Sequence, residues 1–204
     1  MLRPTADGRL ENGCRLPASG ENFSSYSVLG RLLGRTYVHC TVAAIVEDAY
    51  RELARTHAGK RFVYGETGFA SGGEIKPHKT HRNGLSVDFF VPVVDARGRS
   101  TPLSTSAFNR WGYDVEFDSE GRYEDLRIDF ETMAAHLVAL DEAARAHGVG
   151  IWRVIFDPEL QRHLRETRAW PKLQGRVQFS TRRSWVRHDE HYHVDFAVPC
   201  QPLR

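Results

Sequence analysis

The pattern of apolar and polar positions along the chain predicts two long helices. Apolar residues recur at helical spacing between residues 37 and 57, with charged residues between them, and again between residues 130 and 147. This spacing places the apolar side chains on one face, as in helices that pack on a core. A third helix is expected to begin at Asp157-Pro158, because Asp is a favourable N-cap and Pro is tolerated in a first helical turn.

Shorter runs rich in β-branched and aromatic residues predict strands. A hairpin is expected within residues 113–129, around Asp118-Ser-Glu-Gly121, while residues 1–35 read as an irregular N-terminal arm and residues 168–185 as a loop. Helices and strands do not alternate regularly, so we predict an α+β fold, a small and mostly antiparallel sheet flanked by helices, in a single domain spanning residues 1–204. The remaining strands are expected at residues 61–65, 85–93, 149–156 and 191–198.

Composition restricts the class of protein. The 204 residues are 41% hydrophobic and 26% charged, as in ordinary globular proteins. The net charge of +2 argues against a dedicated nucleic-acid binder. No stretch approaches the roughly 18 apolar residues of a membrane span, and the N-terminus lacks the apolar region of a secretory signal. We therefore expect either cytoplasmic action, export by a route without such a signal, or a trimmed chain.

The three cysteines are not spaced as metal ligands. Cys14 and Cys200 lie near the two ends of the chain, where one disulfide would join the termini. Three cysteines allow three pairs, including those with Cys40, and buried free thiols are common, so the pairing stays open between these alternatives.

Two short windows hold most of the candidate chemistry. The first runs from His78 to Phe90 and the second from His188 to His193. Residues His191 and His193 are two apart on a predicted strand, so both imidazoles project from the same face, which Asp195 continues.

The first window offers matching ligands. Asp88 lies on the neighbouring predicted strand and His81 on the loop that leads to it, with Gly84 between them to permit a tight turn. Zinc prefers about four nitrogen, oxygen or sulfur ligands, and a catalytic site leaves one position to water.

Each motif alone has an ordinary alternative, such as surface or hydrogen-bonded histidines. Together the two windows predict a metal site. The other histidines are isolated on helices or helix ends, and we interpret them as structural or solvated: His39, His57, His136, His147 and His163.

The paired motifs, His81-x2-Gly84-x3-Asp88 and His191-x-His193, resemble the signature of the LAS metallopeptidases. That group includes lysostaphin-type enzymes, D-alanyl-D-alanine metallopeptidases and the hedgehog fold. Within it the chain is most similar to the penicillin-insensitive murein endopeptidases, over roughly residues 12–198. The supporting segments are His78-Lys-Thr-His81, Gly84-Leu-Ser-Val-Asp88, Asn12-Gly-Cys14, Phe156-Asp-Pro-Glu-Leu-Gln and His188-Asp-Glu-His191-Tyr-His193-Val.

The resemblance implies one catalytic zinc ion held by His81, Asp88 and His193. It implies that His191 is an acid or base beside the metal and that His188 is a second active-site histidine. His78 matches a position at an additional metal site of the family, and a supporting or substrate-binding role is an equal alternative. The family's Asp-x-x-His, which contributes to the extra site, is not reproduced; the nearest segment is Asp118-Ser-Glu-Gly121, so a single ion is expected.

Other side chains near the windows have two interpretations each. Four aromatic residues either wall a cleft for a peptide stem or belong to the core and its rim: Trp111, Tyr113, Trp185 and Tyr192. Three arginines either meet substrate carboxylates or lie in a solvated loop: Arg182, Arg183 and Arg187. Glu190 is expected on the face opposite His191, so it is not assigned as a general base.

The resemblance implies a zinc peptidase of peptidoglycan, most simply an endopeptidase of the D-alanyl-meso-diaminopimelyl cross-link, acting in the periplasm or at the cell wall. The missing signal suggests an antibacterial effector or lysin, with a delivery system or an immunity protein as partner. The alternatives are a D,D- or L,D-carboxypeptidase on stem peptides and a non-catalytic zinc-binding module.

Overall fold

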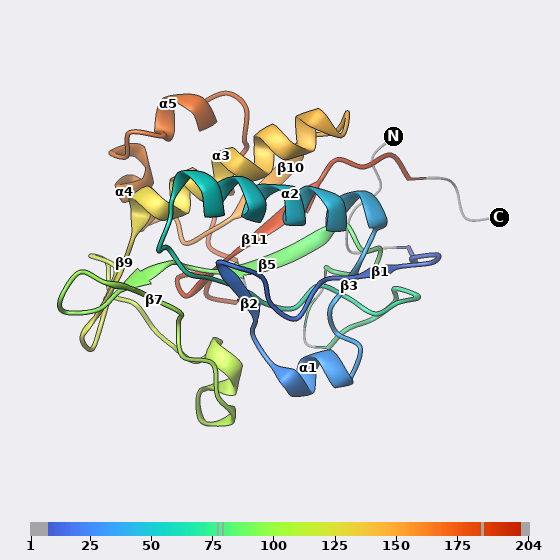
Figure 1. The fold of residues 1–204 in the computed structure, drawn as a ribbon, viewed down its shortest axis with the longest axis horizontal. Helices are drawn as coiled ribbons and strands as arrows, with labels where there is room; N and C mark the ends of the chain where they lie inside the picture. Colours follow the sequence, from blue (N-terminus) through green and yellow to red (C-terminus); the bar gives the residue numbers. More distant parts are fainter. Residues whose placement is uncertain (1–7, 77, 79, 185, 201–204) are drawn as a thin grey trace.

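The protein is described by a computed structural model, which covers residues 8–76, 78, 80–184 and 186–200. A five-stranded sheet with the order β10-β11-β5-β4-β2 forms its centre (Figure 1). Neighbouring strands are antiparallel, except that β2 and β4 are parallel. The predicted α+β class with a mostly antiparallel sheet is confirmed. The five strands are β2 (Phe23–Ser25), β4 (Phe62–Tyr64), β5 (Ser86–Phe90), β10 (Ile151–Ile155) and β11 (His191–Phe196).

Two long helices, α2 (Cys40–Thr56) and α3 (Phe130–Ala146), lie together across one face of this sheet (Figure 1). The Phe89 ring of β5 packs against Tyr50 of α2 and His136 of α3, and all three side chains are buried. Each large apolar side chain buried in this layer contributes roughly 1.5–3 kcal/mol. Because side chains alternate along a strand, the residues on either side of Phe89 point away from the helices.

The remaining elements are short. Besides the central sheet, the described residues form a two-stranded sheet and a four-stranded sheet with the order β7-β6-β9-β8. None of the described helices is long and apolar enough to cross a membrane. The additional strands are β1 (Cys14–Arg15), β3 (Tyr37–Val38), β6 (Val93–Val94), β7 (Ser100–Thr101), β8 (Arg122–Tyr123) and β9 (Leu126–Ile128); the additional helices are α1 (Val28–Leu32), η1 (Ala107–Gly112), α4 (Gln161–Arg165) and α5 (Trp170–Leu173).

Both predicted long helices are confirmed, but their surroundings differ from the prediction. Residues 37–38 form β3 rather than the first turn of α2, and the predicted strand 85–93 is split into β5 and β6. Pro92 lies at this break, where a residue without a backbone N–H cannot continue a ladder.

Three segments differ from the prediction. One contains regular elements where an irregular arm was expected, and in the other two the predicted element begins further along the chain. The N-terminal arm contributes β2 to the edge of the central sheet and also contains β1 and α1. The hairpin is formed by β8 and β9, which both follow Gly121, so Asp118–Gly121 is a separate turn ahead of it. The third helix begins at Gln161, because Asp157 instead accepts a hydrogen bond from the Glu159 backbone in a turn.

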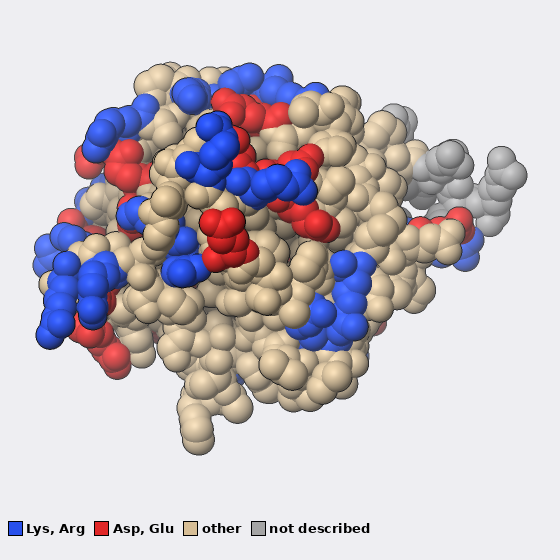
Figure 2. Space-filling model, viewed as in Figure 1, with Lys and Arg blue, Asp and Glu red and all other residues tan. Residues whose placement is uncertain are grey.

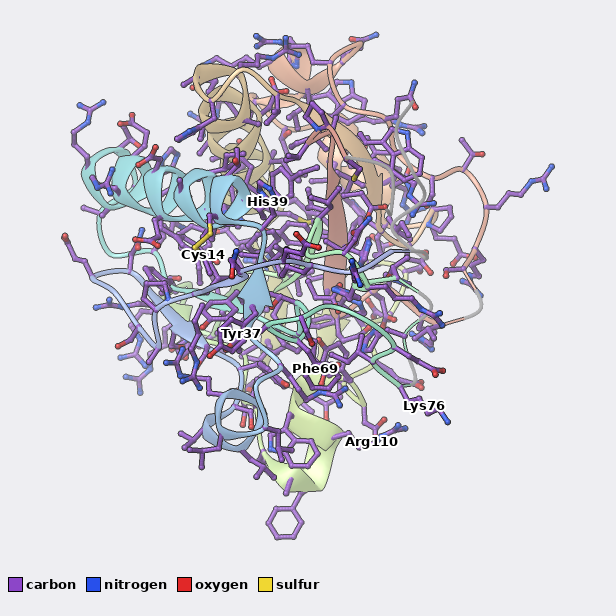
Figure 3. The ribbon with its side chains drawn as sticks, turned by 90° about the vertical axis from the view of Figure 1, so that its right-hand side faces the viewer. Cys14, Tyr37, His39, Phe69, Lys76 and Arg110 are labelled. Atoms are coloured by element: carbon purple, nitrogen blue, oxygen red, sulfur yellow. A yellow bond between two sulfur atoms is a disulfide. The ribbon has the colours of Figure 1, made fainter. Side chains whose placement is uncertain are left out.

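Of the cysteine pairs that the sequence left open, the structure contains the disulfide between Cys14 and Cys40, so the alternative between Cys14 and Cys200 is wrong (Figure 3). Strand β1 pairs with β3 in a register that sets Cys14 opposite Val38, two residues before the start of α2. This pairing brings Cys14 to Cys40, whereas Cys200 is a half-buried free thiol. The bond therefore fixes the N-terminal segment to the first turn of α2.

Candidate active site

Strands β5 and β11 bring the two histidine windows together. They are antiparallel neighbours, and their register sets His193 opposite Asp88 and His191 opposite Phe90. The predicted alternation therefore holds: Asp88, His191 and His193 lie on the sheet face that α2 and α3 leave free. All three side chains are nevertheless buried, because loops cover this face.

The loop before β5 delivers His81 to the same place. Its backbone passes through Gly84 at φ +71°, where a Cβ atom would lie 2.7 Å from the His39 backbone nitrogen. Only glycine combines this left-handed conformation with such a close approach. His81 itself has φ +66°, so the loop holds a histidine in a conformation that non-glycine residues rarely adopt.

Asp88 is the centre of the cluster. Its Oδ1 atom lies 3.2 Å from His81 Nε2 and 2.8 Å from His193 Nδ1. Its Oδ2 atom accepts a hydrogen bond of 3.1 Å from the Tyr113 hydroxyl. Burial alone would raise the pKa of Asp88, but the adjacent His81 and His191 and the hydrogen bonds hold it well below its usual range. The carboxylate is therefore ionised and demands a positive neighbour.

The ring of His81 is oriented as that of a metal ligand. Its Nδ1 lies 2.8 Å from the Thr67 carbonyl oxygen, which can only accept, so Nδ1 carries the proton. The other nitrogen, Nε2, is buried and has no hydrogen-bond partner among the described residues. Burial also lowers the pKa of His81, which keeps that nitrogen neutral. A backbone carbonyl that fixes the tautomer and leaves a lone pair directed at a carboxylate is typical of metal sites.

The ring of His193 is also oriented by a hydrogen bond from the nitrogen that does not face Asp88. Its Nε2 lies 2.8 Å from Asp195 Oδ1, and Asp195 is itself bound by Arg153 and by the Ser86 hydroxyl. Burial would lower the pKa of His193, but the carboxylates of Asp195 and Asp88 raise it to about 10. Two ionised carboxylates around one buried ring require a cation there, either a proton or a metal ion.

His78 lies closer to the centre than the sequence indicated. One ligand atom each from His78, His81 and Asp88 lie within 4.8 Å of one another, so this group could hold a metal ion. His78 Nε2 is also 2.7 Å from Glu66 Oε2. Burial lowers its pKa, but Glu66 and Asp88 raise it overall.

Glu66 is a residue that the sequence reasoning missed. It is a buried carboxylate in the glycine-rich loop after β4, and no motif distinguishes it from a surface acid. Arg35 binds it in a bidentate pair at 2.6 and 2.8 Å, and the Tyr26 hydroxyl donates a hydrogen bond of 3.0 Å. Together these contacts fix the carboxylate that orients His78.

His191 and His188 lie beside the cluster. His191 Nε2 is 3.9 Å from Asp88 Oδ2, and the rings of His188 and His191 are 4.6 Å apart between centroids. Burial lowers the pKa of His191 to about 4 and that of His188 to about 3. Both imidazoles are therefore neutral near pH 7 and each keeps one unprotonated nitrogen.

The predicted position of Glu190 is wrong. Its Oε1 lies 2.7 Å from His191 Nδ1, rather than on the opposite face. Glu190 precedes β11, whose first residue is His191, so strand alternation does not apply to it. Its side chain is buried, which raises its pKa well above its usual range. The contact fixes the orientation of the His191 ring, with Nε2 toward Asp88.

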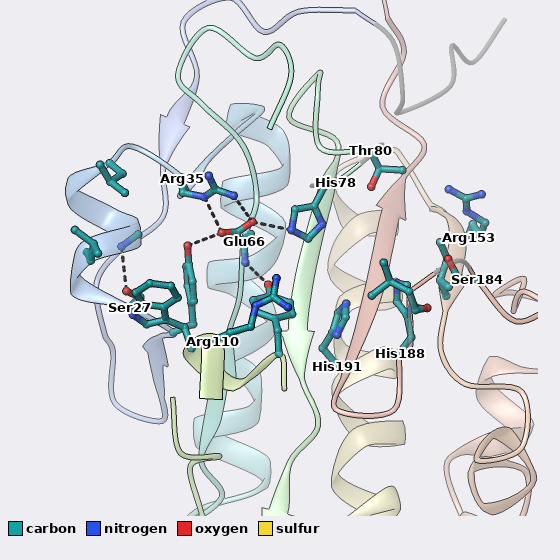
Figure 4. Close-up of a pocket in the computed structure, with 18 residues that line it drawn as sticks. Ser27, Arg35, Glu66, His78, Thr80, Arg110, Arg153, Ser184, His188 and His191 are labelled. Atoms are coloured by element: carbon teal, nitrogen blue, oxygen red, sulfur yellow. Dashed lines mark hydrogen bonds and ion pairs between the residues drawn. The ribbon is translucent and has the colours of Figure 1, made fainter. Parts of the chain in front are cut away.

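A cavity of about 660 Å³ opens beside these residues (Figure 4). This volume is typical of a site for a small molecule or a peptide segment. Leu29 and Leu33 of the α1 segment line one side, and His188 and His191 lie on the side formed by the second window. The lower end of the molecule in Figure 2, where α1 and η1 lie, is largely free of charged side chains.

The aromatic residues and arginines that the sequence suggested as cleft residues line the cavity only in part. Trp111 and Tyr113 line the cavity, whereas Tyr192 is buried on the helix side and bonds to His136. Trp185 lies outside the described residues. The predicted arginines do not line the cavity: Arg183 pairs with Asp157 and Glu159, Arg187 pairs with Asp189 and Glu116, and Arg182 is exposed. The arginines of the lining are Arg35, Arg110 and Arg153.

The histidines interpreted as structural make local contacts away from the cluster. His39 caps α2 by accepting from the Thr41 backbone, His136 bonds to Tyr192 in the core and His147 pairs with Asp48. The other two are half-buried, with His57 beside Thr56 and His163 stacked on Phe130.

The comparisons with known proteins concern the chain as a whole. The family model described as penicillin-insensitive murein endopeptidase matches residues 3–202. A search of the curated proteins found no match to the chain.

Proposed function

The chain belongs to the penicillin-insensitive murein endopeptidase family, whose members are peptidases that act on murein. From this membership we propose that the protein is a zinc-dependent endopeptidase that hydrolyses the D-alanyl-meso-diaminopimelyl cross-link of peptidoglycan. We propose further that the central sheet is a LAS-type core in a single catalytic domain, residues 1–204.

One observation supports the metal most directly. His81 Nε2 is a buried lone pair without a hydrogen-bond partner among the described residues, and it lies 3.2 Å from an ionised carboxylate. An unpaired buried polar atom costs about 1–3 kcal/mol, and a cation between the two groups would remove that cost. His81, Asp88 and His193 would hold the ion, and one carboxylate with two imidazoles is a ligand set that suits zinc.

A bound zinc ion would supply Lewis acidity toward the scissile carbonyl and would lower the pKa of a water molecule. The protein's own residues provide the remaining functions. His191, neutral and oriented by Glu190, is placed to take up a proton beside the cluster and to return it to the leaving amine. His188 lies next to it as a second neutral imidazole, whose Nδ1 donates to the Val186 carbonyl oxygen, so its Nε2 can accept a hydrogen bond or a proton.

His78 has two roles open to it. Its distance to His81 and Asp88 supports an accessory metal ligand, and its bond to Glu66 supports an orienting role in which it donates toward substrate. Because Glu66, fixed by Arg35 and Tyr26, already holds His78 Nε2, we favour a single catalytic zinc ion with His78 as a neighbour that Glu66 orients.

The test is digestion of purified peptidoglycan by the purified protein, with and without a zinc chelator. We expect loss of cross-linked dimers and appearance of monomers, identified by mass, abolished by chelation and restored by added zinc. Release of free terminal D-alanine without loss of dimers would instead identify a carboxypeptidase. Intact sacculi in the presence of bound zinc would identify a non-catalytic zinc-binding module.

We place the action of the protein in the periplasm or at the cell wall, as the substrate requires. The disulfide between Cys14 and Cys40 supports this proposal, because such bonds persist in oxidising compartments. An exported effector or lysin with an immunity partner is the biological role we favour. Directing the chain to the periplasm should lyse a Gram-negative host, whereas cytoplasmic expression should be harmless; equal harmlessness in both would contradict it.

A further inference from the structure

The segment Arg110–Gly112 at the cavity has an unusual backbone. Three consecutive residues, Arg110, Trp111 and Gly112, have φ of +47°, +58° and +98°. Two of them are not glycine, and each non-glycine residue in this region costs about 1 kcal/mol or more. Such strain persists only where the surrounding structure imposes it.

The surroundings do impose it. Asn109 Oδ1 accepts from the backbone of both Ser106, at 2.8 Å, and Gly112, at 2.9 Å. A Cβ atom on Gly112 would lie 2.7 Å from the Phe90 ring, so the loop is pressed against β5. The next residue, Tyr113, donates to Asp88 Oδ2. The strained segment is therefore fixed to the candidate metal cluster itself.

This conformation places the Arg110 side chain at the cavity (Figure 4). Among the described residues, its guanidinium forms one ion pair, with Asp114 at 3.4 Å, and the two side chains are 69% and 47% exposed. Ion pairs this exposed contribute little. A stronger acceptor can therefore replace Asp114 at small cost.

The other two arginines that line the cavity already form ion pairs with buried carboxylates. Arg35 is bidentate to the buried Glu66, and Arg153 donates from both Nε and Nη2 to one carboxylate oxygen of the fully buried Asp195. Releasing either would leave a buried carboxylate unpaired, which is costly. Among the described arginines of the cavity, Arg110 is thus the one available to bind an anion.

The proposed substrate carries such an anion next to the bond that is cut. In the D-alanyl-meso-diaminopimelyl cross-link, the carbon that bears the scissile nitrogen also bears a carboxylate. Glu66 already lines this cavity and Arg35 is bound to it, so a substrate carboxylate that enters needs a cation of its own.

We infer that Arg110 forms the subsite that recognises the carboxylate adjacent to the scissile amide, and that it thereby selects a free over an amidated diaminopimelyl residue. This inference rests on the proposed endopeptidase function. An arginine fork matches a carboxylate in a bidentate, charge-assisted pair and loses that match with a carboxamide.

The test compares two muropeptide dimers, one with the free carboxylate beside the cross-link and one with that carboxylate converted to a carboxamide. For the unaltered protein we expect kcat/KM to be about tenfold higher on the free dimer, the lower end of what a hydrogen bond to a charged group provides. The Arg110→Gln variant should lose about tenfold on the free dimer and little on the amidated one.

Two further variants make the result decisive. Arg110→Gly favours the left-handed backbone and also removes the guanidinium, so it should behave like Arg110→Gln. Arg127→Gln removes an exposed arginine of β9 outside the cavity and should keep the tenfold preference.

An equal preference in Arg110→Gln and the unaltered protein would overturn the inference, as would an equal loss on both dimers or no preference at the start. Failure of the unaltered, zinc-loaded protein to cleave either dimer would refute the proposed function instead. The two failures are therefore distinguishable in one experiment.

Discussion

Asp88 is surrounded by polar side chains that lie close to its two carboxylate oxygens. Two imidazole nitrogens lie within 3.2 Å of one oxygen and a tyrosine hydroxyl lies 3.1 Å from the other. His191 is 3.9 Å away and is held from its far side by Glu190. At the residue scale, Asp88 is thus placed to hold a metal ion and His191 to act beside it. Substitution of Asp88 should therefore affect metal binding, whereas substitution of His191 should affect turnover.

We predict that Asp88→Ala abolishes zinc binding, whereas His191→Ala keeps zinc and lowers turnover by about 10²–10⁴-fold, the usual contribution of a general acid or base. Metal content after dialysis, measured by mass spectrometry, and the rate of dimer cleavage give the two readouts. Circular dichroism controls for folding, since both side chains are buried. Near-normal turnover of the His191 variant would show that the acid–base assignment is wrong.

The grouping of the candidate site residues on one sheet face was largely predictable from residue spacing, but the contacts around them were not. Strand alternation placed His191, His193 and Asp88 on one face, and the register of β5 and β11 confirms it. Glu190 was misplaced because the strand begins one residue later than alternation assumed. Glu66 was missed because its role comes from three distant partners, and no local pattern encodes such contacts.

The loop between His81 and β5 links the element scale to the site. Gly84 has φ +71°, and a Cβ there would lie 2.7 Å from both the His39 backbone nitrogen and Leu10 Cδ2. Gly148, after α3, has a similar φ of +73° but open space around its Cβ position. Comparing substitutions at Gly84 and Gly148 therefore separates the free-energy cost of a left-handed backbone from the cost of a steric clash of the added Cβ atom.

We predict that Gly148→Ala lowers the free energy of unfolding by about 1 kcal/mol, the cost of the backbone conformation alone. Gly84→Ala should cost at least about 2 kcal/mol, because the backbone of His39 cannot move aside easily, and it should also weaken zinc binding by displacing His81. Urea unfolding and zinc titration of both variants measure these effects. Equal destabilisation by the two substitutions would contradict the role of close packing at Gly84.

Similar reasoning explains which elements could be predicted. Helices α2 and α3 were found because an apolar stripe at helical spacing is a local signal that burial reinforces. Strand β2 was assigned to an irregular arm because its three residues are half-buried at the sheet edge and pair with distant β4. Short edge strands of this kind derive their structure from the partner.

At the scale of the whole molecule, the disulfide ties the N-terminal segment to the core. Cys14 and Cys40 are 26 positions apart, and the residues between them include β2 and α1. Several of these residues reach the site: Arg35 and Tyr26 bind Glu66, and Leu29 and Leu33 line the cavity. Closing this loop restricts the unfolded chain and keeps one wall of the cavity in place.

We therefore predict that replacing both Cys14 and Cys40 by serine lowers the free energy of unfolding by about 3–4 kcal/mol, the entropic value for a loop of this length. Reduction of the unaltered protein should have the same effect, whereas Cys200→Ser, at the free thiol, should change stability little. Urea unfolding with and without a thiol reductant provides the measurement. Because the α1 segment forms one wall of the cavity, activity should fall at lower urea concentrations than the unfolding of α2 and α3 in the double variant. Insensitivity of both stability and activity to reduction would show that strand pairing, and not the covalent bond, fixes the N-terminal segment.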